Sequence, residues 1–172
     1  MDRYLSRVSN EDDISDALAL VRSESWSAWS MTPSTEWFRP DEVPGAYEAL
    51  VSVATEADAG HAYNRLMDAL AHNHSGWVYA VAVPGAVHLA RLTPLLPDLP
   101  QATALQVLAD LLNFSVRDQV FIGPDGQQVQ THAAIQAAVT PLTPLLRSRR
   151  AASSGPVERG ATALLEALAD EK

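Results

Sequence analysis

The stretch LAHNHSGWVYAVAVP, from Leu70 to Pro84, lies between two segments that carry the same helical pattern. Residues 57–72 place their apolar side chains on one stripe at a spacing of about 3.6 residues, and residues 76–92 resume that pattern, interrupted by Pro84-Gly85. Such a stripe is typical of an amphipathic helix that packs against a neighbour. The stretch therefore predicts a hinge between two stacked helices.

The histidines of this stretch raise the question of a metal site. His72 and His74 stand only two positions apart, so they would leave most of a coordination shell empty. His61 lies about three turns earlier on the same predicted helix, roughly 16 Å along its axis, and cannot join them. A positive charge at His72 suits the C-terminal end of that helix instead. We expect no metal and no cofactor here.

The rest of the chain carries helical patterns as well. Val, Ile and Thr nowhere alternate with polar residues for long enough to predict a strand. A length of 172 residues suits one domain. We predict an all-α domain over residues 1–172, in which 1–42 form an N-terminal helix with a tryptophan-rich segment and 43–172 form helical repeats. The predicted helices are 10–22, 45–54, 57–72, 76–92, 99–114, 130–147 and 157–170.

An internal repeat runs through these helices. The element apolar-x-x-Leu-Ala occurs at Met67–Ala71, Leu105–Ala109 and Leu165–Ala169, and a second echo links Ala82-Val83 to Ala138-Val139. Repeated helical units that bury small apolar faces against one another are the signature of a solenoid. The repeat predicts a short α-solenoid of about three αα-hairpins, with an additional N-terminal helix.

The order of these short motifs along the chain resembles that in the bacterial HEAT-repeat proteins. Leu70-Ala71-His72 ends one helix, and Ala82-Val83-Pro84 opens the next at the expected distance. The resemblance covers about residues 44–170; it departs from the family at Gly85-Ala86, where large apolar residues are usual, and in the tryptophan-rich segment. It implies HEAT-like hairpins. Because bacterial proteins of this class often lie among polymorphic toxin systems, it also implies a role in toxin immunity.

The charge of the chain bears on its partners. The net charge is -9, and residues 1–60 hold twelve acidic residues against four arginines. That balance disfavours a nucleic-acid surface, which needs clustered basic residues. It favours a basic protein partner, although acidic charge also serves solubility alone. The N-terminus lacks a signal-peptide pattern and no apolar run approaches about 20 residues, so we expect a cytoplasmic protein with no membrane partner.

Catalytic motifs are scarce. The chain has no cysteine and no Gly-x-Ser-x-Gly elbow, and its single lysine, Lys172, is far from any glycine-rich loop. Some HEAT-like solenoids are DNA glycosylases, and Trp37, Trp77 and Asp110 would be candidates for such a site, but that activity needs a basic groove. We therefore predict that the chain is not an enzyme.

Two segments are candidates for binding a protein. The first holds Trp26, Trp29 and Trp37-Phe38 among acidic residues, as interface hot spots do. The alternative is a cap over the end of the solenoid; we assign Trp37-Phe38 to the cap and expect Trp26 or Trp29 to be exposed. The second is an insertion at 115–130, whose apolar residues either bind a partner or fill a gap. The predicted partner-binding residues are Glu24, Trp26, Trp29, Glu36, Asp41, Glu42, Val120, Phe121 and Ile122.

These features predict a non-enzymatic protein-binding protein. On the resemblance, we expect an immunity protein, or antitoxin, that binds and neutralises a basic toxin domain. A general adaptor in a larger assembly is the alternative, and a HEAT-like DNA glycosylase is a third. The sequence leaves open which face binds and whether the chain is a monomer.

Overall fold

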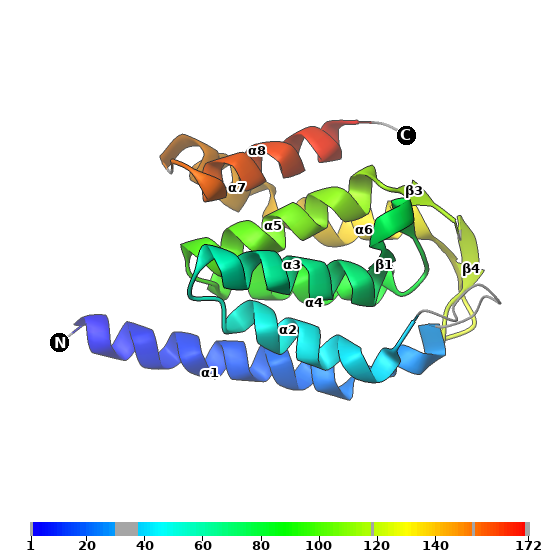
Figure 1. The fold of residues 1–172 in the computed structure, drawn as a ribbon, viewed down its shortest axis with the longest axis horizontal. Coiled ribbons are helices and arrows are strands. Elements are labelled where there is room, and N and C mark those ends of the chain that lie inside the picture. Colours follow the sequence, from blue (N-terminus) through cyan, green and yellow to red (C-terminus); the bar gives the residue numbers. More distant parts are fainter. Residues whose placement is uncertain (1, 30–37, 118, 153, 171–172) are drawn as a thin grey trace.

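The computed structural model describes residues 2–29, 38–117, 119–152 and 154–170, with side chains from residue 10 onward. Most of these residues lie in helices, which confirms the all-α prediction at the level of class (Figure 1). Among the described residues, no helix is long and apolar enough to cross a membrane. The helices are α1 (Asp2–Ser23), α2 (Val43–Val51), α3 (Glu56–Leu70), α4 (Ala82–Leu92), α5 (Asp98–Asn113), α6 (Thr131–Val139), α7 (Thr143–Ala152) and α8 (Pro156–Ala169).

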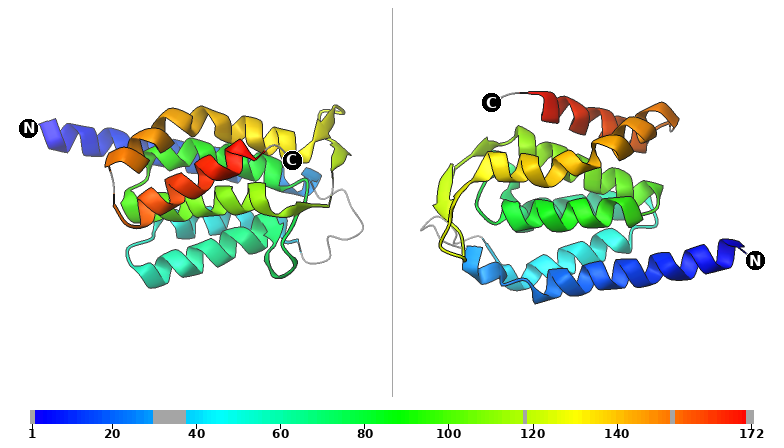
Figure 2. Two further views of the ribbon diagram at one scale, coloured as in Figure 1. Left: turned by 90° about the horizontal axis from the view of Figure 1, so that it is seen from above. Right: turned by 180° about the vertical axis from the view of Figure 1, so that it is seen from behind.

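The helices pack in two rows. In one row, α2, α3, α5 and α8 follow one another from bottom to top of Figure 1, each in contact with the next. In the other row α1 contacts α4 and α4 contacts α6, as the view from behind in Figure 2 shows. The apolar core fills the space between the rows, and α5 is buried most completely.

The repeated Leu-Ala element falls on three helices of one row, although the copies do not share one register. Met67 and Leu105 are fully buried in α3 and α5. In α8 the buried residue is Leu164, whereas Leu165 is half-buried. The second repeated pair does not occupy equivalent positions in the structure. Ala82-Val83 lies at the start of α4, whereas Ala138-Val139 lies at the end of α6.

A different short motif recurs in the second row, the one that contains α4 and α6. The 3₁₀ turns η4 (Thr93–Leu95) and η5 (Thr140–Leu142) both have the sequence Thr-Pro-Leu and follow α4 and α6. Proline lacks a backbone N–H and cannot continue a helix, so each helix ends near this motif. The predicted helix 130–147 is therefore split into α6 and α7.

The start of α3 is set by a capping box. The Thr55 hydroxyl accepts a hydrogen bond from the Asp58 N–H at 3.2 Å, and the Asp58 carboxylate accepts one from the Thr55 N–H at 2.9 Å. Hydrogen bonds from Thr55, led by that of its side chain, lower the pKa of Asp58. Both groups satisfy N–H donors that the first turn leaves unpaired.

The Pro84-Gly85 pair does not interrupt its helix. Both residues lie in the first turn of α4, where proline removes no hydrogen bond within the helix. A Cβ at Gly85 would lie 2.6 Å from a methyl group of Leu70, and the Gly85 carbonyl accepts a hydrogen bond from the Tyr47 hydroxyl at 2.7 Å. This close approach leaves no room for a larger side chain at position 85.

Short strands form where none was predicted. The turn after α3 holds β1 (Ala71–His72), η3 (Asn73–Ser75) and β2 (Trp77–Val78). β2 pairs antiparallel with β1 and parallel with β3 (Ser115–Val116), giving the sheet order β1-β2-β3. Because α3 ends at Leu70, His72 lies in a strand beyond the C-terminal end of the helix and not, as the sequence had predicted, in its last turn.

The insertion after α5 forms a hairpin of β4 (Val120–Ile122) and β5 (Gln128–Gln130). Its turn contains Gly126 at a φ of 79°, a value that favours glycine, and the Asp125 carboxylate accepts a hydrogen bond from the Gln127 N–H at 3.0 Å. The turn signal in the sequence is confirmed. The strands are too short to show the alternation by which strands are predicted.

Candidate protein-binding surface

The two segments predicted to bind a partner meet in the structure. The rings of Trp29, in the 3₁₀ turn η1 (Trp26–Trp29), and Phe121, in β4, pack edge to face with centroids 5.7 Å apart. Edge-to-face packing is a favourable arrangement for aromatic rings. Segments far apart in the sequence thus form one end of the molecule, beside the strands at the right of Figure 1.

The hairpin divides its apolar residues between two faces. Phe121 is buried at 9% exposure, whereas Val120 and Ile122 are 45% and 51% exposed. Successive side chains of a strand point to opposite faces, so Phe121 anchors the hairpin while its two neighbours face outward. Phe121 thus fills a gap, as one of the two alternatives for the insertion expected; Val120 and Ile122 are exposed, and their contact with a partner stays a prediction.

Trp26 is not exposed, and the expectation that it reaches a partner is wrong. Only 4% of it is accessible, and its indole N–H donates to the Val21 carbonyl at 2.8 Å. Its ring packs against His88 and Tyr47 at centroid distances of 5.5 and 6.2 Å. The chain turns back after α1, which directs this side chain into the core.

Glu24 links Trp29, at the surface, to the buried His88. Its carboxylate accepts the indole N–H of Trp29 at 3.1 Å and lies 3.3 Å from Nε2 of His88. His88 is only 6% exposed; burial lowers the pKa of its imidazole, and the hydrogen bond to Glu24 opposes that shift. Glu24 therefore holds Trp29 in place, and the predicted contact of Glu24 with a partner stays a prediction.

The other acidic and aromatic candidates divide in three. Phe38 is buried, as expected of a cap residue. Asp41 and Glu42 are exposed in the 3₁₀ turn η2 (Pro40–Glu42), which contacts η1. Trp37 and Glu36 lie outside the described residues.

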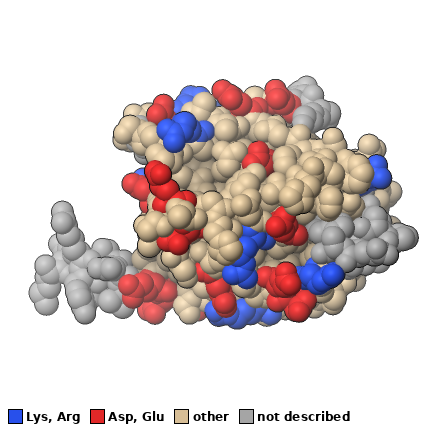
Figure 3. Space-filling model, viewed as in Figure 1, with Lys and Arg blue, Asp and Glu red and all other residues tan. Residues whose placement is uncertain are grey.

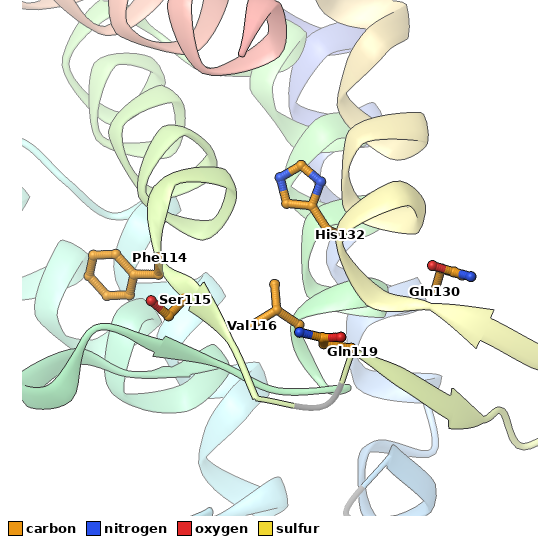
Figure 4. Close-up of a pocket in the computed structure, with 6 residues that line it drawn as sticks. All are labelled: Phe114, Ser115, Val116, Gln119, Gln130 and His132. Atoms are coloured by element: carbon orange, nitrogen blue, oxygen red, sulfur yellow. The ribbon is translucent and has the colours of Figure 1, made fainter. Parts of the chain in front are cut away.

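A cavity of about 520 Å³ opens behind the hairpin, between the end of α5 and the start of α6 (Figure 4). Its described walls offer side-chain amides, an imidazole and a hydroxyl, all groups that form hydrogen bonds. No residue of this cavity was singled out in the sequence, although it opens at both ends of the predicted insertion. The lining residues are Phe114, Ser115, Val116, Gln119, Gln130 and His132.

The acidic residues do not gather in a single patch on the face of the molecule that Figure 3 shows. On the face in Figure 3, carboxylates lie over several elements with arginines among them. Arg22 forms an ion pair with Glu48 at 2.8 Å. Exposed carboxylates at the middle of α1 are Glu11, Asp12, Asp13 and Asp16.

The residues considered for chemistry lie in other settings. His72 bonds to the Ser75 hydroxyl, and Arg117 stacks 4.0 Å above the ring of Trp77. The Asp110 carboxylate accepts hydrogen bonds from the Tyr63 hydroxyl at 2.7 Å and the Gln106 amide at 3.0 Å. Among the described residues, no three His, Asp or Glu side chains gather as a metal site would require.

No protein-family model, curated protein or solved structure matches the chain.

Proposed function

We propose that this chain is a non-enzymatic protein-binding protein that docks its partner on the β4–β5 hairpin. One observation carries the proposal: Val120 and Ile122 stand exposed side by side on a hairpin whose opposite face is anchored by Phe121 on Trp29. Exposed apolar residues on an ordered support are the usual core of a protein interface. The anchor holds them in place before binding, which reduces the entropy lost on association.

We further propose that the fold is a short HEAT-like α-solenoid with an added N-terminal helix. The two rows of helices and the Leu-Ala element on α3, α5 and α8 support this assignment. In a solenoid, an insertion between repeats often carries the binding function. The hairpin lies between α5 and α6 and is such an insertion.

Within that class we propose an immunity protein that neutralises a basic toxin domain. A net charge of -9 accelerates the approach of a basic protein by electrostatic steering. Apolar contacts at Val120 and Ile122 then slow its release, and the release rate controls most differences in affinity.

The test is capture of the partner from cells of the native source with tagged full-length chain. We expect one basic protein in stoichiometric amount, and we expect the double variant Val120→Ser/Ile122→Ser to lose it. Leu20→Ser is the matched control, because Leu20 is also an exposed large hydrophobic residue but lies on α1. The control should retain the partner.

The captured protein then tests the immunity role. Expressed alone, it should arrest growth, and co-expression of this chain should relieve the arrest while the double variant does not. A captured protein that is harmless when expressed alone contradicts immunity and favours an adaptor. Equal capture by the double variant contradicts docking on the hairpin.

A further inference from the structure

The hairpin is closed at both ends by pairs of residues that hydrogen-bond across it. At one end the Thr131 N–H donates to the Gln119 carbonyl at 3.0 Å, and at the other the Gly123 N–H donates to the Gln127 carbonyl at 2.8 Å. In an antiparallel ladder, directly opposed pairs alternate between hydrogen-bonded and non-hydrogen-bonded. The two closing pairs therefore determine which strand residues bond across the hairpin.

Phe121 and Val129 form the bonded pair midway along the ladder. Val120 and Ile122, on either side of Phe121, belong to non-bonded pairs. Their backbone N–H and C=O groups point away from β5, toward the outer edge of β4.

That outer edge is open in the described part of the chain. There, β4 pairs with no strand other than β5, and no hydrogen bond from a turn or loop reaches Val120 or Ile122. An unpaired strand edge is a template for another strand. Here it coincides with the two exposed apolar side chains of the proposed binding surface.

We infer that β4 accepts an extended segment of a basic protein partner as a third strand of this sheet. Strand addition uses main-chain hydrogen bonds for affinity and alternate side chains for specificity. The outward backbone groups of Val120 and Ile122 supply the main-chain hydrogen bonds that give affinity. Their exposed side chains supply the contacts that give specificity. This inference rests on the proposed function and specifies how its partner docks.

Charge selects the occupant of the edge. A second copy of this chain would bring a net charge of -9 against the same charge. β4 has three residues, too few to bury the roughly 1,200 Å² of a stable interface. The added segment therefore needs electrostatic attraction to charged groups near the strand. Exposed carboxylates stand at Asp125 in the hairpin turn and at Asp41 and Glu42 in η2, which contacts η1 under the hairpin. A segment with basic residues meets these groups favourably.

A defined peptide tests the edge directly. The probe is an eight-residue peptide of alternating Lys and Val, blocked at both ends, added to the full chain while its amide signals are followed by nuclear magnetic resonance. We expect the Val120 and Ile122 amides to shift and their exchange with solvent to slow at least tenfold at saturation. The Gln128 amide, on the outer edge of β5, should not change. No response at Val120 and Ile122 up to millimolar peptide overturns the inference.

Proline variants separate backbone pairing from side-chain contact. Ile122→Pro removes an outward N–H that the hairpin does not use, and prolines are tolerated at such edge positions. Gln128→Pro makes the same change on the opposite edge, and Ile122→Ala keeps the N–H but removes the side chain. We expect Ile122→Pro to weaken peptide binding at least tenfold and Gln128→Pro by less than twofold. Slow exchange of the Phe121 and Val129 amides in each variant verifies that the hairpin is intact.

The same variants separate this inference from the proposed function. A cellular partner that is lost from Val120→Ser/Ile122→Ser but fully retained by Ile122→Pro docks through side chains alone; that result overturns strand addition and leaves the function standing. Dimerisation of the free chain in sedimentation, abolished by Ile122→Pro, overturns the inference in favour of a second copy. Loss of the partner from Ile122→Pro, with retention by Gln128→Pro, supports it.

Discussion

Helix α5 and the β4–β5 hairpin are neighbours in the chain and treat their apolar residues in opposite ways. α5 packs between α3 and α8 and buries nearly its whole length. In β4 only the central residue of three is buried. Apolar side chains in α5 hold the fold together, whereas the two exposed ones in β4 leave apolar surface for another molecule. The difference separates the residues that stabilise the fold from those to which we assign binding in the proposed function.

The largest effect should come from a cavity in the helical core. Leu108→Ala removes a fully buried side chain of α5, and we expect it to lower the free energy of unfolding by about 3 kcal/mol. Ile122→Ala, the matched change on the hairpin, should cost at most about 0.5 kcal/mol because its side chain is half exposed. Urea denaturation measures both. Similar losses at the two positions would break the comparison.

A glycine pair sharpens the contrast between tight and open packing. Gly85→Ala places a Cβ 2.6 Å from a Leu70 methyl group, so we expect a loss of about 2 kcal/mol. Gly60→Ala lies in α3, where the new Cβ would meet nothing within 4 Å outside its chain neighbours and the backbone of its own helix, and it should stabilise the protein by about 0.5–1 kcal/mol. Thermal unfolding of the two variants gives opposite shifts. A gain in stability for Gly85→Ala would contradict the close approach of α3 and α4.

The buried histidine predicts a dependence of stability on pH. Burial lowers the pKa of His88 in the folded protein, so below about pH 6.5 the unfolded chain binds its proton more readily. The stability contribution is complete above that pH and is lost as the pH falls through the lowered pKa. The slope is at most about 1.4 kcal/mol per pH unit.

Denaturant midpoints between pH 7.5 and 5 measure this slope. His88→Gln should reduce this slope. An identical slope in His88→Gln and the parent protein would contradict the role assigned to His88.

The smallest effect concerns the contact that joins the two regions. A double-mutant cycle of Trp29→Ala and Phe121→Ala should give a coupling free energy of about 1 kcal/mol, as expected for an edge-to-face aromatic pair. Trp29→Ala combined with Ile135→Ala, in the core of α6, is the control and should be additive. Additive effects of Trp29 and Phe121 would mean that the hairpin is not anchored through this pair.

Most of the helical structure could be predicted from the sequence, because the 3.6-residue spacing of buried side chains is a direct consequence of helix geometry. The boundaries of α3, α5 and α8 fall within about two residues of the predicted ones. The strands could not be predicted, because two or three residues cannot display an alternating pattern. Their positions depend on tertiary contacts, as the parallel pairing of Trp77 with Ser115 shows.

The geometry of the candidate surface could be predicted in part. The repeat spacing located the insertion, and its turn residues indicated a reversal of the chain. The sequence carries no signal for the direction in which a tryptophan of an irregular segment points, so Trp26 was assigned wrongly. Trp26 packs against His88 and Tyr47, which belong to two different helices, and a sequence pattern does not show that these helices meet.

The hairpin leaves the helical rows and returns to them at fixed points. The Arg117 N–H donates to the Val78 carbonyl at 2.9 Å on the way out, and Thr131 opens α6 on the return. Between these points, the exposed side chains of the hairpin do not pack in the helical core. The entropic cost of closing a longer loop grows only slowly with its length. Substitutions and changes of length in this segment therefore disturb the packing of the helices least. On the function proposed above, such changes alter the partner that is bound and leave the helical rows intact.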